Sequence, residues 1–355
     1  MVVAGGGTGG HFFPGLAVAQ AVVRRAPETE VLFVGGRRGI EASLAPRYGF
    51  PLLALPLSGF AGVGAGARLA ALAALPLSVL RCVGLCVRRR PAAVMGLGGY
   101  ASFPMGAAAV LTGTPLLLLE PNVEPGLANR VLGCWASLVA TAFPQTARRF
   151  AGRALVLGNP VRAELAAVGA ERPPERPLRL LVFGGSRGAR ALNDALLAAL
   201  PALARFEGGL EVLHQTGEED LARVRAAYAA SKVPARVEPF LHDMAEAYGW
   251  CHAAVCRAGA TTLAELAAAG RPALLVPFPH AAGDHQTRNA RGLCDLGGAR
   301  WERQSALDAG ALVRHLRVLA DPAERARMAA ALRRVSRPSA ADDVAGLLLA
   351  AGEAA

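Results

Sequence analysis

The chain has 355 residues, 53% of them apolar, and because one hydrophobic core rarely organises a chain of this length, we expect two domains. Its six cysteines form neither a CxxC pair nor a set with histidine at zinc spacing, which indicates free thiols in a reducing compartment. The net charge is +11, but neither interleaved aromatics nor a known binding motif accompanies it, so nucleic acid is not an expected partner.

The predicted elements alternate between strand and helix, the pattern of doubly wound parallel sheets. In the first half, apolar runs predict strands at 2–4, 31–35, 52–55, 93–96, 116–119, 138–140 and 154–157. The first of these strands starts at Val2, which leaves no room for a basic and apolar leader. We therefore expect a cytoplasmic protein.

A basic segment stands out in this half, because no acidic residue occurs between Glu41 and Glu120. It predicts one helix, or two helices separated near Pro76, with these apolar and basic residues: Arg68, Leu72, Leu75, Leu80, Arg81, Arg88, Arg89 and Arg90. Arginines beside an exposed apolar face hold a helix in the interface of an anionic bilayer. The alternative is an amphipathic helix that packs on its own sheet. The charge-free stretch is shorter than the roughly 20 residues of a spanning helix, so no transmembrane segment is predicted.

A proline-rich stretch, 169–177, interrupts the alternating pattern and marks a linker. Beyond it, further strands are predicted at 178–183, 210–214, 236–237, 253–256 and 273–276. After Asp321 the pattern is helical, and we expect the last helix to return to the first domain.

Two glycine-rich turns, 5–10 and 184–189, each lie between a predicted strand and a helix. Such turns bring backbone N–H groups and a helix N-terminus close to an anionic ligand. The first turn also fits the GxGxxG pattern of nicotinamide enzymes, but the second strand ends in Arg37 and Arg38 rather than in the expected acidic residue. Those arginines would suit NADP, whereas the second turn favours a different ligand.

Further motifs follow the predicted strands, where open α/β sheets bind ligands. In order along the chain they read GGGTGGH, GLGGYAS, GLANR, GNPVR, GGSRGA, CRAGATTLAE and DHQTRNA. With this set, the chain closely resembles the bacterial lipid II synthase family, the MurG N-acetylglucosaminyltransferases, almost from end to end. The resemblance implies an α/β GT-B fold of two Rossmann-like doubly wound parallel-sheet domains facing a cleft. Residues 1–158 would form the acceptor and membrane-associating domain, 159–335 the donor domain, and the helix at about 336–355 would pack back on the first.

The resemblance also implies the reaction. The family moves N-acetylglucosamine from UDP-N-acetylglucosamine to the 4-hydroxyl of undecaprenyl-diphosphate-linked N-acetylmuramoyl-pentapeptide, which makes lipid II from lipid I in peptidoglycan biosynthesis. The sugar linkage inverts from α to β, which calls for one direct displacement assisted by a base and by positive donors near departing UDP. No cofactor and no metal are expected, because the chain lacks a DxD motif and the family uses arginine and helix dipoles instead.

The donor residues carried over from the family begin with Ser186, expected at the diphosphate, and Glu265, expected at the ribose hydroxyls. The others are Thr8, Gly9, Gly10, Asn122, Arg162, Phe240, Leu241, Met244, Thr261, His285 and Gln286. His285 departs from the glutamine that the family often has. The alternatives are a helix cap for Ser186, a salt bridge between domains for Arg162, a solvated side chain for Glu265 and core packing for the segment 240–244.

On the acceptor side, the resemblance points to Gly10, His11, Tyr100 and Asn129. His11 is the predicted general base, because an imidazole accepts a proton at neutral pH. The alternative is a histidine that only hydrogen-bonds the acceptor phosphate or the backbone. Glu120 and Asn122 are also predicted to be catalytic; they stand in Leu-Glu-Pro-Asn, where many relatives have His-Glu-Gln-Asn.

The expected partners are UDP-N-acetylglucosamine, lipid I and the anionic surface at the cytoplasmic face of the cell membrane, where the protein would be peripheral. Division and elongation proteins are further partners to consider. Two other functions compete with this reading. One is a GT-B transferase that glycosylates diacylglycerol, and the other is a catalytically silent scaffold that binds nucleotide sugar and membrane.

Overall fold

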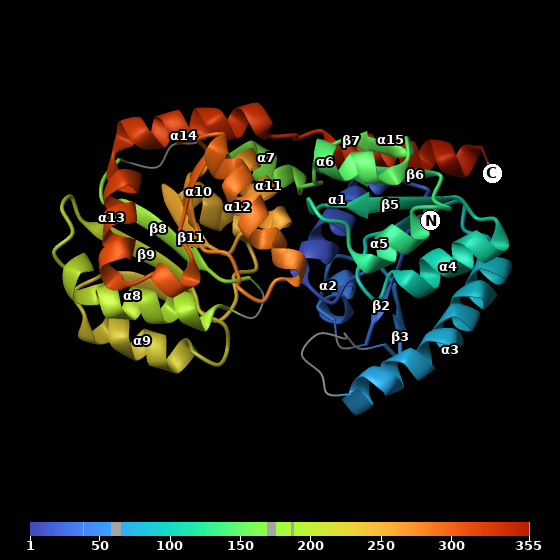
Figure 1. Ribbon diagram of the computed structural model, residues 1–355, viewed down its shortest axis with the longest axis horizontal. Helices are drawn as coiled ribbons and strands as arrows, with labels where there is room; N and C mark the ends of the chain where they lie inside the picture. The colour runs from blue at the N-terminus through green and yellow to red at the C-terminus, as the bar shows by residue number, and fades with distance from the viewer. Residues whose placement is uncertain (38, 58–64, 169–174, 186–187, 355) are drawn as a thin grey trace. The chain divides into compact units, whose positions relative to one another are not determined.

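The computed structural model describes residues 1–37, 39–57, 65–168, 175–185 and 188–354, without the side chains of 65–73 and of Ala282. By their internal contacts the residues form two compact units, Met1–Arg162 with Arg337–Ala355 and Ala163–Ser336. Each unit is built on one parallel β-sheet with helices on its faces (Figure 1).

The N-terminal unit contains a seven-stranded sheet of order β3-β2-β1-β4-β5-β6-β7. Its strands are β1 (Val2–Ala4), β2 (Leu32–Gly36), β3 (Leu52–Leu55), β4 (Val94–Gly96), β5 (Leu116–Glu120), β6 (Leu138–Thr141) and β7 (Ala154–Val156). Strand order reverses at β1, where Val3 pairs with Phe33 on one side and with Met95 on the other. Parallel sheets bind ligands at the carboxyl ends of strands beside such a reversal. The loops after β1 and β4 therefore lie at the expected place for a site.

The helices of this unit are α1 (Gly9–Arg25), α2 (Glu41–Arg47), α3 (Ala65–Arg89), α4 (Phe103–Thr112), α5 (Leu127–Leu132), α6 (Pro144–Ala147), the 3-10 turn η1 (Arg148–Phe150) and α15 (Ala340–Glu353). The last helix packs on the first. Arg24 forms an ion pair with Asp342 at 3.0 Å, Arg25 donates to the carbonyl of Asp342 at 2.7 Å, and Leu348 is fully buried in the same core. The end of the chain thus completes the N-terminal unit.

Helix α3 continues through Pro76, so the alternative of two separate helices is wrong. A proline inside a helix removes one backbone hydrogen bond and clashes with the preceding turn. Here Ser78, Cys82 and Cys86 follow at four-residue spacing and are all buried. Ala74 and Leu75, before the proline, pack on the same core as Cys82 and Cys86, and packing on both sides stabilises one amphipathic helix across the proline. Among the described residues, no helix is long and apolar enough to cross a membrane.

The C-terminal unit contains a six-stranded sheet of order β10-β9-β8-β11-β12-β13, in which neighbouring strands are parallel. Its strands are β8 (Leu178–Phe183), β9 (Leu210–Gln215), β10 (Ala235–Glu238), β11 (Ala253–Cys256), β12 (Ala273–Leu275) and β13 (Ala299–Trp301). The sequence did not predict β13, because three residues with Arg300 at their centre carry no apolar run. Strand order reverses between β8 and β11, and the second glycine turn follows β8.

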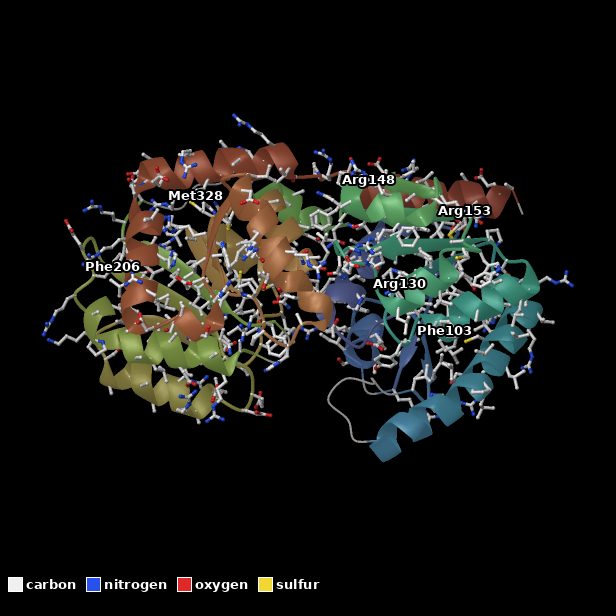
Figure 2. All side chains as sticks on the ribbon, in the orientation of Figure 1. Phe103, Arg130, Arg148, Arg153, Phe206 and Met328 are labelled. Atoms are coloured by element: carbon white, nitrogen blue, oxygen red, sulfur yellow. The ribbon has the colours of Figure 1, made fainter. Side chains whose placement is uncertain are left out.

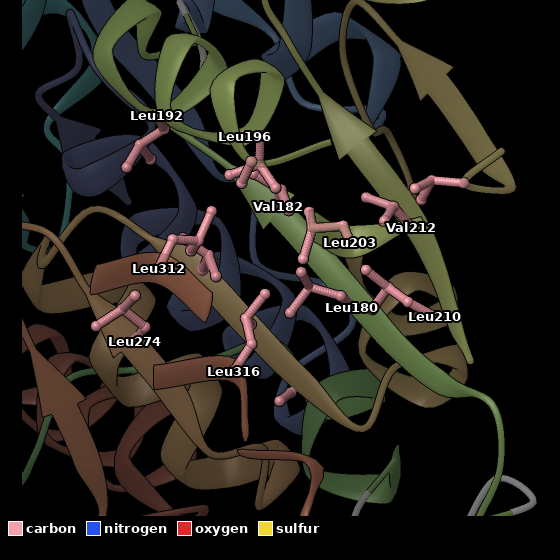
Figure 3. Close-up of a cluster of buried hydrophobic side chains, with 14 of the residues drawn as sticks. Leu180, Val182, Leu192, Leu196, Leu203, Leu210, Val212, Leu274, Leu312 and Leu316 are labelled. Carbon is pink, nitrogen blue, oxygen red and sulfur yellow. The ribbon is translucent and has the colours of Figure 1, made fainter. Parts of the chain in front are cut away.

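The helices of the C-terminal unit are α7 (Ala163–Ala167), α8 (Arg190–Leu203), α9 (Leu221–Ala230), α10 (Met244–Trp250), α11 (Ala260–Ala269), η3 (Ala282–Asp284), α12 (His285–Asp295), η4 (Gln304–Ala306), α13 (Ala309–Ala320) and α14 (Pro322–Val335). Figure 3 shows the core between the sheet and two of these helices, where Leu196 of α8 and Leu316 of α13 lie over Leu180 and Val182 of β8. All four side chains are fully buried. The packed core gives the loops at the sheet edge a rigid support.

Candidate active site

Three loops at the carboxyl ends of β1, β4 and β5 lie against one another in the N-terminal unit. A Cβ atom on Gly5 would lie 2.7 Å from Cβ of Leu97, closer than side chains approach. A Cβ atom on Gly98 would lie 3.2 Å from Nδ2 of Asn129, and the φ of Gly98 is +80°. The glycines of the first two motifs are therefore required by close approach between loops and by positive φ.

His11 lies in the first turn of α1 and is half-buried. Its Nδ1 atom lies 3.2 Å from the hydroxyl oxygen of Thr8. Gly99 borders the imidazole, since a Cβ atom there would lie 3.6 Å from Cε1 of His11. The ring of Tyr100 borders the same turn, 3.0 Å from where a Cβ atom of Gly7 would be. The structure thus brings Thr8, His11 and Tyr100 to one glycine turn.

Glu120 ends β5 and is 2% exposed. One carboxylate oxygen accepts hydrogen bonds from the backbone and side-chain N–H groups of Asn122, at 3.0 and 3.2 Å. The other accepts from the backbone of Gly126 at 2.9 Å and from the amide of Asn129 at 3.0 Å. Burial raises the pKa of Glu120, and these four donors oppose the rise. Glu120 thus fixes the loop that carries Asn122 to the first turn of α5, which carries Asn129.

In the C-terminal unit, the side chain of Gln215 holds the second glycine turn by a hydrogen bond. Its amide nitrogen donates to the carbonyl of Gly185 at 2.6 Å, and its amide oxygen accepts the N–H of Leu241 at 3.0 Å. Leu241 is buried, whereas Phe240 and Met244 are half-buried. One side chain thereby connects the turn to the segment expected to contact uracil. Ser186 itself lies outside the described residues.

Glu265 lies on α11, one helical turn after Thr261, and the exposed fractions of the two residues are 7% and 8%. The hydroxyl of Tyr248 donates to its Oε2 atom at 3.2 Å. Burial and the charge of Glu265 raise the pKa of Tyr248 well above its usual value, so this tyrosine stays protonated. The alternative of a solvated glutamate is wrong: a fixed, buried carboxylate stands here.

The loop after β12 is held by Arg257 and Gln286. Gln286 accepts the N–H of Phe278 at 2.9 Å, and the guanidinium of Arg257 lies 5.4 Å from the centre of the Phe278 ring. Arg257 also donates to the carbonyls of Val276 and Pro277 at 3.1 and 3.2 Å, and burial lowers its pKa to about 10. His285 is half-buried beside Gln286 at the start of α12. Sequence reasoning missed Arg257, although it stands inside the CRAGATTLAE motif.

Among the residues that the structure describes, the Arg162 side chain contacts two aromatic residues of the N-terminal unit. Its guanidinium lies 4.9 Å from the centre of the Phe13 ring and donates to the hydroxyl of Tyr48 at 3.4 Å. The side chain is 8% exposed. Its expected contact with the donor stays a prediction.

All six cysteines are free thiols, as the sequence predicts. Within the described ranges, no three histidine, cysteine or acidic side chains are grouped in a way that could hold a metal ion.

A network of buried polar side chains packs against the second glycine turn. Asn193 of α8 donates to the carbonyl of Thr216 at 3.0 Å and to Asp220 at 2.8 Å. His214 at the end of β9 lies 3.0 Å from the amide oxygen of Asn193 and 3.2 Å from the hydroxyl of Tyr228. A side chain on Gly188 would overlap the carbonyl of Thr216, so the turn rests on this network.

His214 makes the stability of this unit depend on pH. Burial lowers its pKa to about 4, so the unfolded chain takes up a proton near pH 6.5 and the folded chain does not. The stability that His214 contributes is therefore present above pH 6.5 and is lost as pH falls from 6.5 toward 4, with a loss of about 2 kcal/mol at pH 5. Urea unfolding followed by Trp250 and Trp301, in a Trp135→Phe background, measures this loss.

The matched variant is His214→Gln, which keeps a polar side chain but cannot take up a proton. It should lose about 2 kcal/mol less stability than the parent between pH 7 and pH 5. An identical pH dependence in the two proteins would show that His214 is not the titrating group.

The chain is similar to known proteins over almost its whole length. The glycosyltransferase family 28 N-terminal domain matches residues 1–141, and the C-terminal domain of the same family matches residues 179–344. A relative from Anaeromyxobacter sp. (strain K), named UDP-N-acetylglucosamine--N-acetylmuramyl-(pentapeptide) pyrophosphoryl-undecaprenol N-acetylglucosamine transferase, is 44% identical over 353 residues, 98% of this chain and 92% of the relative. A relative of the same name from Syntrophotalea carbinolica is 49% identical over 304 residues, 84% of this chain and 83% of the relative.

Two solved structures are also similar to this chain. The crystal structure of Acinetobacter baumannii MurG matches with a TM-score of 0.76 at 32% identity and covers 98% of both chains. A glycosyltransferase of kitacinnamycin matches with a TM-score of 0.72 at 16% identity, over 99% of this chain and 98% of that one, which shows the fold alone. The chain therefore belongs to the MurG family within glycosyltransferase family 28 and has the GT-B fold of two parallel-sheet α/β domains, as its motifs predict.

Proposed function

We propose that this chain transfers N-acetylglucosamine from UDP-N-acetylglucosamine to the 4-hydroxyl of undecaprenyl-diphosphate-linked N-acetylmuramoyl-pentapeptide, forming lipid II from lipid I. The observation that carries the proposal is the 44% identity, over 98% of this chain, to a relative named for this transfer. The N-terminal unit would bind the acceptor and the C-terminal unit the donor.

His11 is the proposed general base. Nδ1 of His11 lies 3.2 Å from the hydroxyl oxygen of Thr8; in the tautomer that donates Nδ1–H to this hydroxyl, Nε2 carries the lone pair that accepts a proton. As this proton leaves the acceptor 4-hydroxyl, its oxygen attacks C1 of the sugar and the bond from C1 to the UDP oxygen breaks. The proton ends on His11 and the negative charge leaves with UDP. A single displacement of this kind inverts the anomeric centre from α to β.

The neighbouring loops would bind the acceptor. Tyr100 is half-buried beside the first glycine turn, and Asn122 is half-buried in the loop after β5. Their polar groups suit the sugar and the diphosphate of the acceptor. Glu120 would act through the loop, because its carboxylate is occupied by hydrogen bonds to Asn122, Gly126 and Asn129. Gly10 would present its backbone at the start of α1, where the helix dipole favours an anion.

On the donor side, Glu265 would accept the ribose hydroxyls, with Thr261 one turn before it. The motif around Ser186 and the start of α8 would bind the diphosphate and stabilise the charge of departing UDP. Gln286 and His285 would contact the sugar, while Phe240, Leu241 and Met244 would contact uracil. The fixed carboxylate of Glu265, 7% exposed, supports this arrangement, because a preorganised acceptor loses little entropy when it binds a hydroxyl.

Turnover by the parent protein tests the proposed function. Purified protein is incubated with UDP-N-acetylglucosamine and a short-chain lipid I analogue, and UDP release is followed with and without the analogue. We expect UDP release that depends on the analogue and equals the disaccharide formed. Binding of UDP-N-acetylglucosamine without acceptor-dependent release of UDP would contradict the proposal.

We also propose that the α3 side of the N-terminal unit lies on the anionic surface of the cytoplasmic face of the membrane. Leu77, Leu80 and Val87 of α3 are 50%, 66% and 62% exposed, next to exposed arginines at 81 and 88–90. Leu75 instead packs, partly buried, on the core. Arg68 and Leu72 lie among the side chains outside the description.

The exposed apolar surface extends beyond α3, the helix in the segment that the sequence predicts to bind the membrane. Leu111 of α4 is 72% exposed. Leu127 and Val131 of α5 are 75% and 40% exposed, and Trp135, which follows this helix, is 59% exposed. Helix α4 packs on both α3 and α5, and exposed Arg130 adds a positive charge on α5 (Figure 2). Apolar side chains flanked by arginines suit the interface of an anionic bilayer.

Substitution of Arg88, Arg89 and Arg90 by alanine should weaken binding to anionic vesicles roughly 100-fold, at about 1 kcal/mol for each arginine. Cosedimentation with phosphatidylglycerol vesicles measures the change. The control replaces Arg327, Arg333 and Arg334 of α14, which alters net charge equally in the other unit and should leave binding unchanged. Equal vesicle binding by the two triple variants would contradict the proposal that this surface binds the membrane. Equal binding of the parent protein to neutral and to anionic vesicles would contradict it as well.

A further inference from the structure

Glu41 is a fully buried carboxylate that no step of the proposed mechanism uses. It is the first residue of α2 and its exposed fraction is 0%. Its Oε2 atom accepts the N–H of Gly7 at 2.7 Å, and its Oε1 atom accepts the N–H of Gly36 at 2.8 Å. Side chains on Gly6, Gly35 or Gly39 would overlap it. The carboxylate is thus enclosed by glycine backbone from the turn after β1 and from the end of β2 with the residues that follow it.

The turn that Glu41 contacts has little conformational preference of its own. Gly5, Gly6 and Gly7 have φ angles of +149°, +148° and +84°, which glycine alone adopts readily and from which it departs as readily. A hydrogen bond to a carboxylate is shorter and stronger than one to a neutral acceptor. The bond between Gly7 and Glu41 therefore anchors a turn that its own sequence leaves flexible.

The anchored turn borders two proposed acceptor residues. The Tyr100 ring lies 3.0 Å from where a Cβ atom of Gly7 would be, and its hydroxyl lies 3.2 Å from where one of Gly36 would be. Thr8 follows Gly7 directly, and its hydroxyl lies 3.2 Å from Nδ1 of His11. Both residues that donate to Glu41 are therefore neighbours of Tyr100, and one of them leads into His11.

We propose that Glu41 is a positioning residue of the acceptor site, which fixes the first glycine turn and thereby the places of His11 and Tyr100. The inference rests on the proposed function of that site. A carboxylate suits this role because both of its oxygens accept, whereas the amide of glutamine has one acceptor and would set its NH2 group against a backbone N–H. Glutamine is thus a substitute of equal size that disturbs one of the two bonds.

The first measurement is kcat of Glu41→Gln with the lipid I analogue at a temperature well below its Tm. We expect a loss of about 10- to 100-fold, because small misplacement of reacting groups has effects of this size. The Kd for UDP-N-acetylglucosamine should change much less than kcat, since Glu265 and most other residues proposed for the donor lie in the other unit, and only Thr8, Gly9 and Gly10 of the first glycine turn are among them. The control is Val139→Ala on β6, a fully buried position of the same sheet, which lowers Tm and should leave kcat at the parental value.

A double-mutant cycle with His11→Ala separates positioning from general destabilisation. If Glu41 acts through His11, Glu41→Gln should cost much less in the His11→Ala background than in the parent. If Glu41→Gln does not fold, Glu41→Asp enters the cycle, because it keeps the charge but withdraws the carboxylate from Gly7 and Gly36. Parental kcat in the folded variant would overturn the positioning role, and equal losses in both backgrounds would overturn the positioning of His11, while the proposed function stands in either case. Absence of turnover in the parent would overturn both.

Discussion

Replacement of His11 by alanine is expected to lower kcat about 10²- to 10⁴-fold, the usual contribution of a general base. The imidazole is half-buried in the first turn of α1, with Nδ1 3.2 Å from the hydroxyl of Thr8. Alanine preserves the helix but leaves no group to take the acceptor proton. The affinity for UDP-N-acetylglucosamine should not change, because the residues proposed for ribose and uracil lie in the C-terminal unit. Steady-state kinetics with the lipid I analogue and calorimetry with the donor measure the two quantities.

The control for this variant is Arg24→Ala near the other end of α1, where the side chain forms a half-exposed ion pair with Asp342. It tests whether any change in α1 slows the reaction, and we expect parental kcat. If His11→Ala turns over at the parental rate, His11 is not the base. A loss confined to the KM of the acceptor would instead favour the alternative in which His11 only hydrogen-bonds the acceptor.

Replacement of Glu265 by alanine is expected to raise the KM for UDP-N-acetylglucosamine roughly 10- to 100-fold, with a much smaller effect on kcat. A hydrogen bond to a charged group contributes about 1.5–3 kcal/mol, and the ribose hydroxyls would lose at least one. Ribose is remote from the reacting C1 atom, so the contact between Glu265 and ribose stabilises the ground state and the transition state equally. Initial rates at varied donor concentration measure the change.

Tyr248→Phe is the matched control for Glu265→Ala. The tyrosine hydroxyl donates to Glu265 at 3.2 Å, and its removal leaves the carboxylate in place. This variant should lose about 1 kcal/mol of stability while the donor KM stays near the parental value. A donor KM that rises equally in both variants would mean that Glu265 matters for packing around Tyr248 and not for ribose.

The fold could be predicted from the sequence because its strands are continuous apolar runs followed by glycine turns. Strand β8 illustrates this, since Leu178–Phe183 is buried almost throughout and leads into GGSRGA. Where that signal is absent, prediction fails. Strand β13 has only three residues around Arg300 and is defined by its pairing with β12. The continuity of α3 through Pro76 is decided by packing on one core of Ala74 and Leu75 before the proline and of Cys82 and Cys86 after it.

The candidate site was predictable where a residue stands inside a motif, as His11, Glu265 and Gln286 do. The roles assigned to these residues stay predictions until they are tested. The supporting residues were harder to find, because nothing in the local sequence shows that Glu41 reaches Gly7, 34 positions earlier, or that Gln215 reaches Gly185. Their contacts arise from sheet order, which places the end of β2 beside β1 and the end of β9 beside β8.

The structure of the product is the sharpest test of the proposed transfer. The parent protein is incubated with UDP-N-acetylglucosamine, a short-chain lipid I analogue and diacylglycerol together, and the anomeric configuration and linkage of the product are determined by NMR. We expect a β-linked N-acetylglucosamine on the 4-hydroxyl of the muramoyl sugar. An α-linked product, a linkage to another hydroxyl, or glycosylated diacylglycerol beside unchanged lipid I analogue would contradict it.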